Sequence, residues 1–144
     1  MSAEPIVILT GAGISKESGL DTFRCAGGIW SQVSLEDVAT PEAFMRDPEK
    51  VQAFYNARRA SLKEVAPNPA HRALAKLEAD YAGTVTLVTQ NIDDLHERAG
   101  CRDVIHMHGE LRLAFCAACG AKGQAPEILS PEDACSHCGS VGTV

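Results

Sequence analysis

Four of the six cysteines stand in two Cys-x-x-Cys pairs near the end of the chain. Cys116 and Cys119 form the first pair, Cys135 and Cys138 form the second, and fifteen residues separate the two. A tight Cys-x-x-Cys turn brings two thiolates to the same ion, and zinc takes four such ligands tetrahedrally. The spacing therefore predicts one structural zinc ion in a reducing compartment, with two disulfides as the alternative. With all four ligands supplied by protein, no position is left for a catalytic water.

The composition restricts the class of protein. With 144 residues, of which 45% are hydrophobic, the chain is large enough for one core. A net charge of −6 without any basic run disfavours a reader of duplex nucleic acid and favours a basic peptide or a small ligand as partner. Residues 1–5 lack a basic leader and the apolar run that follows them is short. We therefore expect a soluble cytoplasmic protein without a membrane span, and the oligomeric state stays open.

Short apolar runs predict a parallel sheet. Ile6 to Leu9 is continuous and partly β-branched, as in a strand buried on both faces, and it leads into the Gly11-Ala12-Gly13 turn. Ser15 is expected to cap a short helix after this turn. A second strand is expected over 84–89 and a weaker third at 104–105. The fold class predicted is α/β, with a Rossmann-like parallel sheet.

Three helices are expected between the first two strands. Thr40-Pro41, Asp47-Pro48 and Asn68-Pro69 each place a capping residue before a proline at the first helical position. The polar, glycine-rich stretch from Thr22 to Val38 is interpreted as a long functional loop. The predicted organisation is a Rossmann-like part, a helical insertion and a zinc module, over residues 1–39 with 83–110, 40–82, and 111–144, respectively.

Polar side chains follow the second and third strands. Gln90, Asn91 and Asp93 come directly after the second strand, at the edge where open α/β sheets bind ligands. The alternative for Asn91 and Asp93 is that they only cap the next helix. His108 follows the third strand on the same edge, and His106 is an equal candidate there from the residues alone.

The turn at Gly11-Ala12-Gly13 is a second candidate site. Small residues there let main-chain N–H groups approach a pyrophosphate. The full dinucleotide pattern GxGxxG needs a third glycine at position 16, where this chain has Lys16. By itself the turn fits a phosphate site and a plain strand-to-helix turn equally well.

Tyr55 and Arg58 stand three residues apart on the longest predicted helix, so their side chains share a face. A phenol beside a guanidinium can hold a carboxylate through one neutral and one charge-assisted hydrogen bond. The alternative is a core tyrosine next to an arginine whose charged end reaches solvent.

Several motifs together resemble the sirtuins, the NAD-dependent protein lysine deacylases. They are Gly11-Ala12-Gly13-Ile14-Ser15, Gly19-Leu20-Asp21-Thr22-Phe23-Arg24, Thr89-Gln90-Asn91-Ile92-Asp93-Asp94-Leu95-His96, His108-Gly109 and the paired Cys-x-x-Cys. Phe54-Tyr55-Asn56-Ala57-Arg58-Arg59 is similar to the branch that includes bacterial sirtuins, whose Tyr-x-x-Arg receives acidic acyl groups such as succinyl.

The resemblance implies a reaction and a site. Acyl groups would pass from protein or peptide lysine to NAD, the co-substrate, giving nicotinamide and O-acyl-ADP-ribose. His108 would be the base that deprotonates a ribose hydroxyl, Asn91 would also be catalytic, and Tyr55 and Arg58 would bind the acyl group. His106 matches no catalytic position. The implied cofactor-binding residues are Gly11, Ala12, Gly13, Ser15, Phe23, Arg24, Trp30, Gln90, Asn91, Ile92 and Asp93, and one Zn²⁺ would bind Cys116, Cys119, Cys135 and Cys138.

The sequence departs from the family pattern in two places, and the second of them leads to an alternative. Cys25 stands where the family commonly has glycine, and the chain ends at Val144. Sirtuins continue with a Phe-Gly-Glu segment that binds substrate, with further strands, and with a Gly-Thr-Ser loop and an Asn that hold the adenosine half of NAD. The resemblance therefore implies that the parallel sheet of this chain is incomplete at the C-terminus. The alternative is therefore a catalytically silent, zinc-stabilised fragment or interaction module.

Overall fold

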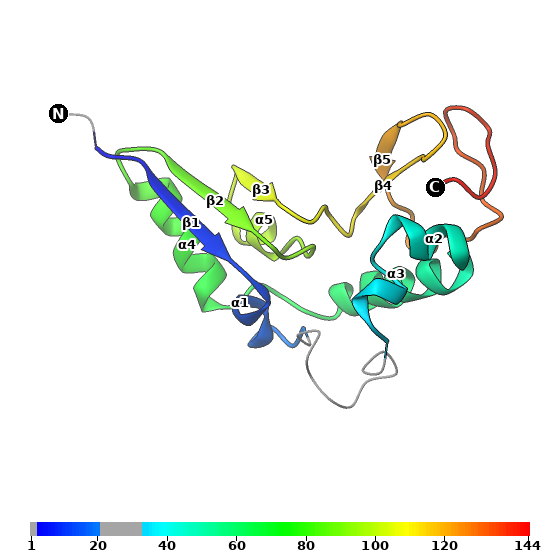
Figure 1. Ribbon diagram of the computed structural model, residues 1–144. Helices are drawn as coiled ribbons and strands as arrows, with labels where there is room; N and C mark the ends of the chain where they lie inside the picture. Colours follow the sequence, from blue (N-terminus) through cyan, green and yellow to red (C-terminus); the bar gives the residue numbers. More distant parts are fainter. Residues whose placement is uncertain (1–2, 21–32) are drawn as a thin grey trace. The chain divides into compact units, whose positions relative to one another are not determined.

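The computed structural model describes residues 3–20 and 33–144 (Figure 1). It divides into two compact units, and each is described by itself. The first contains Met1–Cys25 and Leu62–Glu110, and the second contains Ala26–Ser61 and Leu111–Val144. Among the helices described, none is both long enough and apolar enough to cross a lipid bilayer.

The three helices predicted from the capping signals are present. They are α2 over Pro41–Arg46, α3 over Pro48–Lys63 and α4 over Pro69–Asp80. Thr40 and Asp47 each accept a hydrogen bond from the main-chain N–H three residues later, at 3.1 and 3.0 Å. Asn68 forms a full capping box with His71, in which each side chain binds the other residue's main-chain N–H. The helical segment 40–82, which was expected to form one insertion, is divided between the two units: α4 lies in the first unit and α2 lies in the second.

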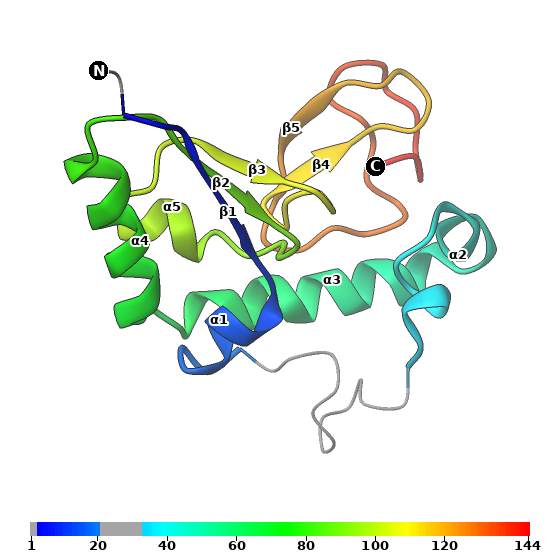
Figure 2. The ribbon, with the colours of Figure 1, turned by 60° about the vertical axis from the view of Figure 1, so that its left-hand side comes forward.

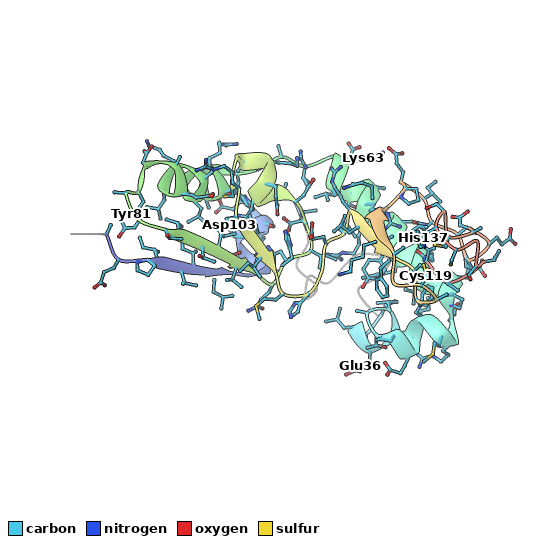
Figure 3. The ribbon with its side chains drawn as sticks, turned by 90° about the horizontal axis from the view of Figure 1, so that it is seen from above. Glu36, Lys63, Tyr81, Asp103, Cys119 and His137 are labelled. Atoms are coloured by element: carbon cyan, nitrogen blue, oxygen red, sulfur yellow. The ribbon has the colours of Figure 1, made fainter. Side chains whose placement is uncertain are left out.

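The first unit is built on the predicted parallel sheet. Its strands β1 (Ile6–Thr10), β2 (Val85–Thr89) and β3 (Val104–His106) are ordered β1-β2-β3, so β2 is central. α4 contacts β2 and also α5 (Leu95–Ala99), and both helices lie along one face of the sheet (Figure 2). Tyr81, just after α4, donates a hydrogen bond to the Glu4 carbonyl at 2.8 Å, which joins the end of α4 to the start of β1 (Figure 3).

The short helix α1 (Ala12–Lys16) corrects one expectation. The helix begins after Gly11, whose position has no side-chain cap, and Ser15 lies inside the helix as its one buried residue. The prediction that Ser15 caps this helix was therefore wrong. The Ser15 hydroxyl instead donates a hydrogen bond to Asp93, far along the chain.

The second unit combines helices with a small hairpin. A 3-10 turn (Leu35–Asp37), α2 and α3 precede the antiparallel strands β4 (Leu113–Phe115) and β5 (Lys122–Gln124). The side chains of Val38, Ala43, Val51 and Phe54 are buried here. Most of the predicted functional loop, from Thr22 to residue 32, lies outside the described residues.

One face of the sheet is apolar and exposed in the part of the chain that the structure describes. Val7, Leu9 and Ile105 are 71%, 62% and 51% exposed. The strand register places Val7 beside Thr86, and Val88 beside both Leu9 and Ile105, so all of them share the face opposite α4 and α5. Parallel sheets are ordinarily covered on both faces, so this surface favours association.

We expect the 144-residue chain to self-associate through this face. The double substitution Leu9→Lys with Ile105→Lys should lower the average mass, because association would then bury two charges. Val141→Lys changes an exposed apolar residue of the second unit and should have no such effect. Sedimentation velocity over a concentration series measures this, and a wild-type chain that stays monomeric throughout would contradict it.

Candidate functional site

The predicted polar residues of the first unit gather at the carboxyl edge of its sheet. The residues after β2 reach the turn after β1, because the Gln90 N–H donates to the Thr10 carbonyl at 3.0 Å. The residues after β3 reach the same place, because the Met107 N–H donates to the Thr89 carbonyl at 2.9 Å. This edge therefore brings together the connections after β1, β2 and β3, which carry the predicted site residues.

Asn91 joins two of these connections. Its side-chain Nδ2 donates to the Gly11 carbonyl at 3.1 Å and lies 3.2 Å from the Ser15 Oγ. Its main-chain N–H donates to the Thr89 Oγ1 at 3.1 Å. Asn91 is buried, so these bonds satisfy groups that water cannot reach. The side chain is thus fixed beside the glycine turn.

Asp93 is the buried carboxylate of the site. One oxygen accepts a hydrogen bond from the Ser15 hydroxyl at 2.9 Å, and the other accepts the Leu95 N–H at 3.1 Å. The helix-start alternative considered for Asp93 therefore describes one of its two oxygens, at the beginning of α5. The other oxygen binds α1, so Asp93 does more than begin a helix.

His71 extends this chain of hydrogen bonds and was not identified from the sequence. Its Nδ1 accepts the Asn68 N–H at 3.3 Å, so the ring proton is on Nε2, which lies 3.5 Å from the Ser15 Oγ. Burial lowers the pKa of His71, which favours this neutral form. The signal that could have identified His71 is the Asn-Pro-x-His spacing, because a polar residue at the third helical position can complete a capping box.

A second buried histidine, His96, lies against the first. The two rings are 4.9 Å apart and edge to face. The Thr10 hydroxyl donates to the Thr89 Oγ1 at 2.9 Å, so the His96 Nε2, 3.0 Å from the Thr10 Oγ1, must be the donor in their bond. Burial, then the neighbouring His71, lower the pKa of His96. Both rings are therefore neutral near pH 7.

His106 and His108 have different surroundings, although the residues alone made them equal candidates. His108 is exposed, and its Nδ1 donates to the Gln90 carbonyl at 3.0 Å. Because that nitrogen carries the proton of a neutral ring, Nε2 keeps its lone pair, as a base requires. The His106 side chain is 6% exposed and binds protein groups through both nitrogens.

The glycine turn leaves room beside α1. A Cβ built on Gly13 would meet nothing within 4 Å in the described part of the chain, and one on Gly11 would meet only the Gln90 Oε1 at 4.0 Å. Open space beside main-chain N–H groups suits an anionic ligand such as a pyrophosphate. Of the other predicted cofactor-binding residues, Ile92 is half-buried beside Asn91, whereas Phe23, Arg24 and Trp30 lie outside the described residues.

Tyr55 and Arg58 lie on α3 in the second unit, as predicted, around a shared aromatic ring. The Phe54 ring lies edge to face with the Tyr55 ring at 5.2 Å, and the Arg58 Cζ is 5.5 Å from the Phe54 ring centre. Burial raises the pKa of the Tyr55 phenol, and the Arg58 charge opposes that shift. The Phe54 ring thus lies against both a phenol and a guanidinium, two groups that can donate hydrogen bonds to a carboxylate.

The side chain of Asn56, which lies between these two residues in the sequence, connects α3 to the zinc module through hydrogen bonds. Its amide donates to the Leu129 carbonyl at 2.8 Å and accepts the Leu129 N–H at 2.9 Å. Arg59 holds the Asn56 oxygen at 2.5 Å and donates to the Glu127 carbonyl at 3.4 Å. No sequence signal identified Asn56, because its partner is 73 residues away.

The four predicted zinc ligands converge. Their sulfur atoms all lie within 4.8 Å of one another, with 3.8 Å between Cys116 and Cys138 and 3.9 Å between Cys119 and Cys135. A tetrahedron with Zn–S bonds of about 2.3 Å has edges of about 3.8 Å, so the set fits zinc. A disulfide would need about 2.05 Å, and the structure has none among the described cysteines. The disulfide alternative is therefore excluded for these four.

Two glycines close the cysteine turns. Gly120 and Gly139 have φ of +72° and +74°, a region that residues with a Cβ rarely adopt. Their N–H groups donate to the carbonyls of Cys116 and Cys135 at 2.7 and 2.8 Å. The Thr143 hydroxyl lies 3.2 Å from the Cys116 sulfur, within hydrogen-bonding distance.

Comparison with known proteins agrees with this architecture. The model of the Sir2 family matches residues 11–143. A curated NAD-dependent protein deacylase of Escherichia coli strain K12 is 56% identical over 140 residues, 96% of this chain and 50% of the relative. One from Bdellovibrio bacteriovorus is 53% identical over 141 residues, 96% of this chain and 60% of the relative. The chain thus spans about half to three-fifths of the length of these relatives.

Solved structures confirm the predicted fold class. A Sir2 homologue in complex with NAD superposes with a TM-score of 0.85 at 45% identity, over 96% of this chain and 54% of the other. A Sir2 variant with a deacetylated p53 peptide and 3′-O-acetyl ADP-ribose gives 0.72 at 33% identity, over 94% and 56%. These findings favour the deacylase interpretation over the interaction module.

The cysteine cluster predicts that each chain binds one zinc ion and that this ion stabilises the folded state. A strong chelator should release about one zinc ion per chain and lower the melting temperature, because zinc binding to thiolates is coupled to folding. Cys138→Ser should lose the ion, whereas Cys101→Ala, which changes a buried cysteine outside the cluster, should keep it. Metal analysis and calorimetry measure both effects, and a metal-free chain with an unchanged melting temperature would refute the structural role.

Proposed function

The chain belongs to the Sir2 family, and we propose that it is the part of an NAD-dependent protein lysine deacylase that binds the nicotinamide-ribose end of NAD and carries the general base. The whole protein would transfer acyl groups from protein or peptide lysine to NAD, releasing nicotinamide and O-acyl-ADP-ribose. The observation that best supports this proposal is that Asn91, Asp93 and His108 lie at one edge of the sheet, beside an open glycine turn.

His108 is the proposed base. Its Nδ1–H donates to the Gln90 carbonyl, so in the neutral ring Nε2 carries the lone pair that a base needs. NAD, when bound, supplies the ribose carbon that the acyl oxygen attacks as nicotinamide leaves. The His108 Nε2 then takes a proton from a ribose hydroxyl, which lets the acyl group migrate.

The remaining residues of the edge bind and orient. The Gly11-Ala12-Gly13 turn offers main-chain N–H groups to the pyrophosphate. Asn91 and Asp93 hold the ribose and the nicotinamide amide, and the network through Ser15 keeps both side chains in place before the ligand arrives. Ile92, Gln90, Phe23, Arg24 and Trp30 complete the proposed cofactor site.

Tyr55 and Arg58 are proposed to accept the carboxylate of acidic acyl groups such as succinyl. Their position around Phe54 supports this, because a neutral phenol beside a guanidinium matches a carboxylate. Acetyl-lysine would remain a substrate, since an acetyl group has no charge to bind. Basic peptides suit the net charge of −6, and the thiolate zinc set suits a reducing cytoplasm.

The base is tested by replacing His108 with asparagine. Its amide can still donate to the Gln90 carbonyl, but it cannot accept the ribose proton, so kcat should fall by about 100-fold or more. In the protein expressed from its complete gene, nicotinamide release from an acyl-lysine peptide measures this. His106→Gln, assayed at saturating NAD, should keep most of kcat. Loss of kcat in His106→Gln alone would mean that the other histidine is the base.

The acyl preference is tested with Arg58→Met. Loss of a charge-assisted contact of roughly 1.5–3 kcal/mol should reduce kcat/KM for a succinyl-lysine peptide at least about tenfold. Acetyl-lysine turnover should change little. Lys50→Met removes a positive charge from the same helix and should leave the succinyl-to-acetyl ratio unchanged. Equal losses on both substrates in Arg58→Met would refute the carboxylate-binding role.

A further inference from the structure

The His106 ring lies between two hydrogen-bond acceptors. Its Nδ1 is 2.9 Å from the Asn91 carbonyl oxygen, and its Nε2 is 2.6 Å from the Glu97 Oε1. The side chain is 6% exposed, whereas that of Glu97 on α5 is 39% exposed. Water therefore has little access to the imidazole, and the two protein oxygens must satisfy it.

Only a doubly protonated ring can bind both of these oxygens. A carbonyl and an ionised carboxylate accept hydrogen bonds and donate none, and a neutral imidazole has a single N–H. The Glu97 carboxylate, then the Asn91 carbonyl and Glu110, raise the pKa of His106, while burial opposes them. The neighbouring His96 is neutral, because burial lowers its own pKa, so it does not oppose the charge on His106.

The carbonyl that His106 holds is one of three in a row. The Met107 N–H binds the Thr89 carbonyl, the His108 ring binds the Gln90 carbonyl, and the His106 ring binds the Asn91 carbonyl. The connection after β3 thus continues the pairing of β2 and β3 beyond the strands, with two imidazole rings in place of main-chain donors. The main chain that carries Gln90 and Asn91 is fixed by these bonds.

We propose that His106 is a positioning residue, whose imidazolium, held by Glu97, fixes the main chain of Asn91 and so sets the affinity of the site for NAD. This role rests on the proposed function, because it assumes that the residues at 90–93 bind NAD. It differs from the role proposed for His108, which is to take a proton from the ribose. The loss of His106 should therefore appear in the KM for NAD and not in kcat.

Protonation gives the proposal a signature that a merely structural residue lacks. The folded pKa of His106 is raised, so both bonds are fully formed below pH 6.5, its ordinary value, and one of them is lost as the pH rises through the folded pKa. The single proton of the neutral ring stays on Nε2, which faces the Glu97 carboxylate, so the bond to the Asn91 carbonyl is the one that is lost. The KM for NAD of the wild type should increase over that alkaline range. In His106→Ala the KM should be about tenfold higher at pH 6.5 and should not increase further through this transition.

Glu97→Gln is the matched variant. A glutamine amide can donate to an unprotonated Nε2 while the ring Nδ1–H still binds the Asn91 carbonyl, so a neutral His106 keeps both bonds. This variant should retain a KM for NAD within about twofold of the wild type, without the alkaline increase. A KM as high as that of His106→Ala in Glu97→Gln would overturn the proposal.

Two measurements decide it. First, ¹⁵N NMR of the imidazole rings in the 144-residue chain should show that His106 is doubly protonated at pH 6.5 and has a pKa above the ordinary histidine pKa. A single neutral tautomer of His106 at pH 6.5 would refute the proposal, and this test needs no enzyme turnover. Second, the KM for NAD is compared among the wild type, His106→Ala and Glu97→Gln in the protein from its complete gene. An active His106→Ala with an unchanged KM overturns the positioning role and leaves the proposed function standing, whereas an inactive, folded wild type overturns the proposed function.

Discussion

The first unit depends on burying one carboxylate, that of Asp93. A buried charge is tolerated only when hydrogen bonds replace its water, and the donors to Asp93 come from the Ser15 hydroxyl and the Leu95 N–H. To supply the first donor, α1 must begin directly after the glycine turn and direct Ser15 inward. The arrangement of the connections after β1 and β2 therefore follows from one buried group, and the same group lies at the ligand-binding edge.

Local sequence signals predicted local structure well. The three helices that were predicted to begin at a proline do begin there. Such starts can be predicted because capping involves only atoms within about one turn. The assignment of Ser15 as a cap failed because its hydroxyl binds Asp93, 78 residues away, and a local rule cannot include that competitor. For His71 only the capping box with Asn68 is local and follows from spacing, whereas its contact with Ser15 spans 56 residues.

The candidate site was predictable to different degrees. The cysteine cluster follows from spacing, because each pair lies in one turn and the ion defines the geometry between pairs. His106 and His108 could not be separated by residue type, and only the resemblance to sirtuins selected one. In the structure they differ by burial and by partner, since the Glu97 carboxylate binds the buried His106 and the Gln90 carbonyl binds the exposed His108. Such differences depend on packing between α5 and β3, and the spacing of residues in the sequence gives no information about that packing.

The fastening of α3 to the zinc module has a consequence for how this region can vary in evolution. The side chains of Gln52, Asn56 and Arg59 all bind main-chain atoms, of residues 144, 129 and 127, respectively. Most side chains from 120 to 128 are exposed, so their identities matter little to these bonds. An inserted or deleted residue would instead shift the partners at 127 and 129 relative to one of the two cysteine turns. Between its two cysteine pairs the chain should therefore tolerate changes of composition far better than changes of length.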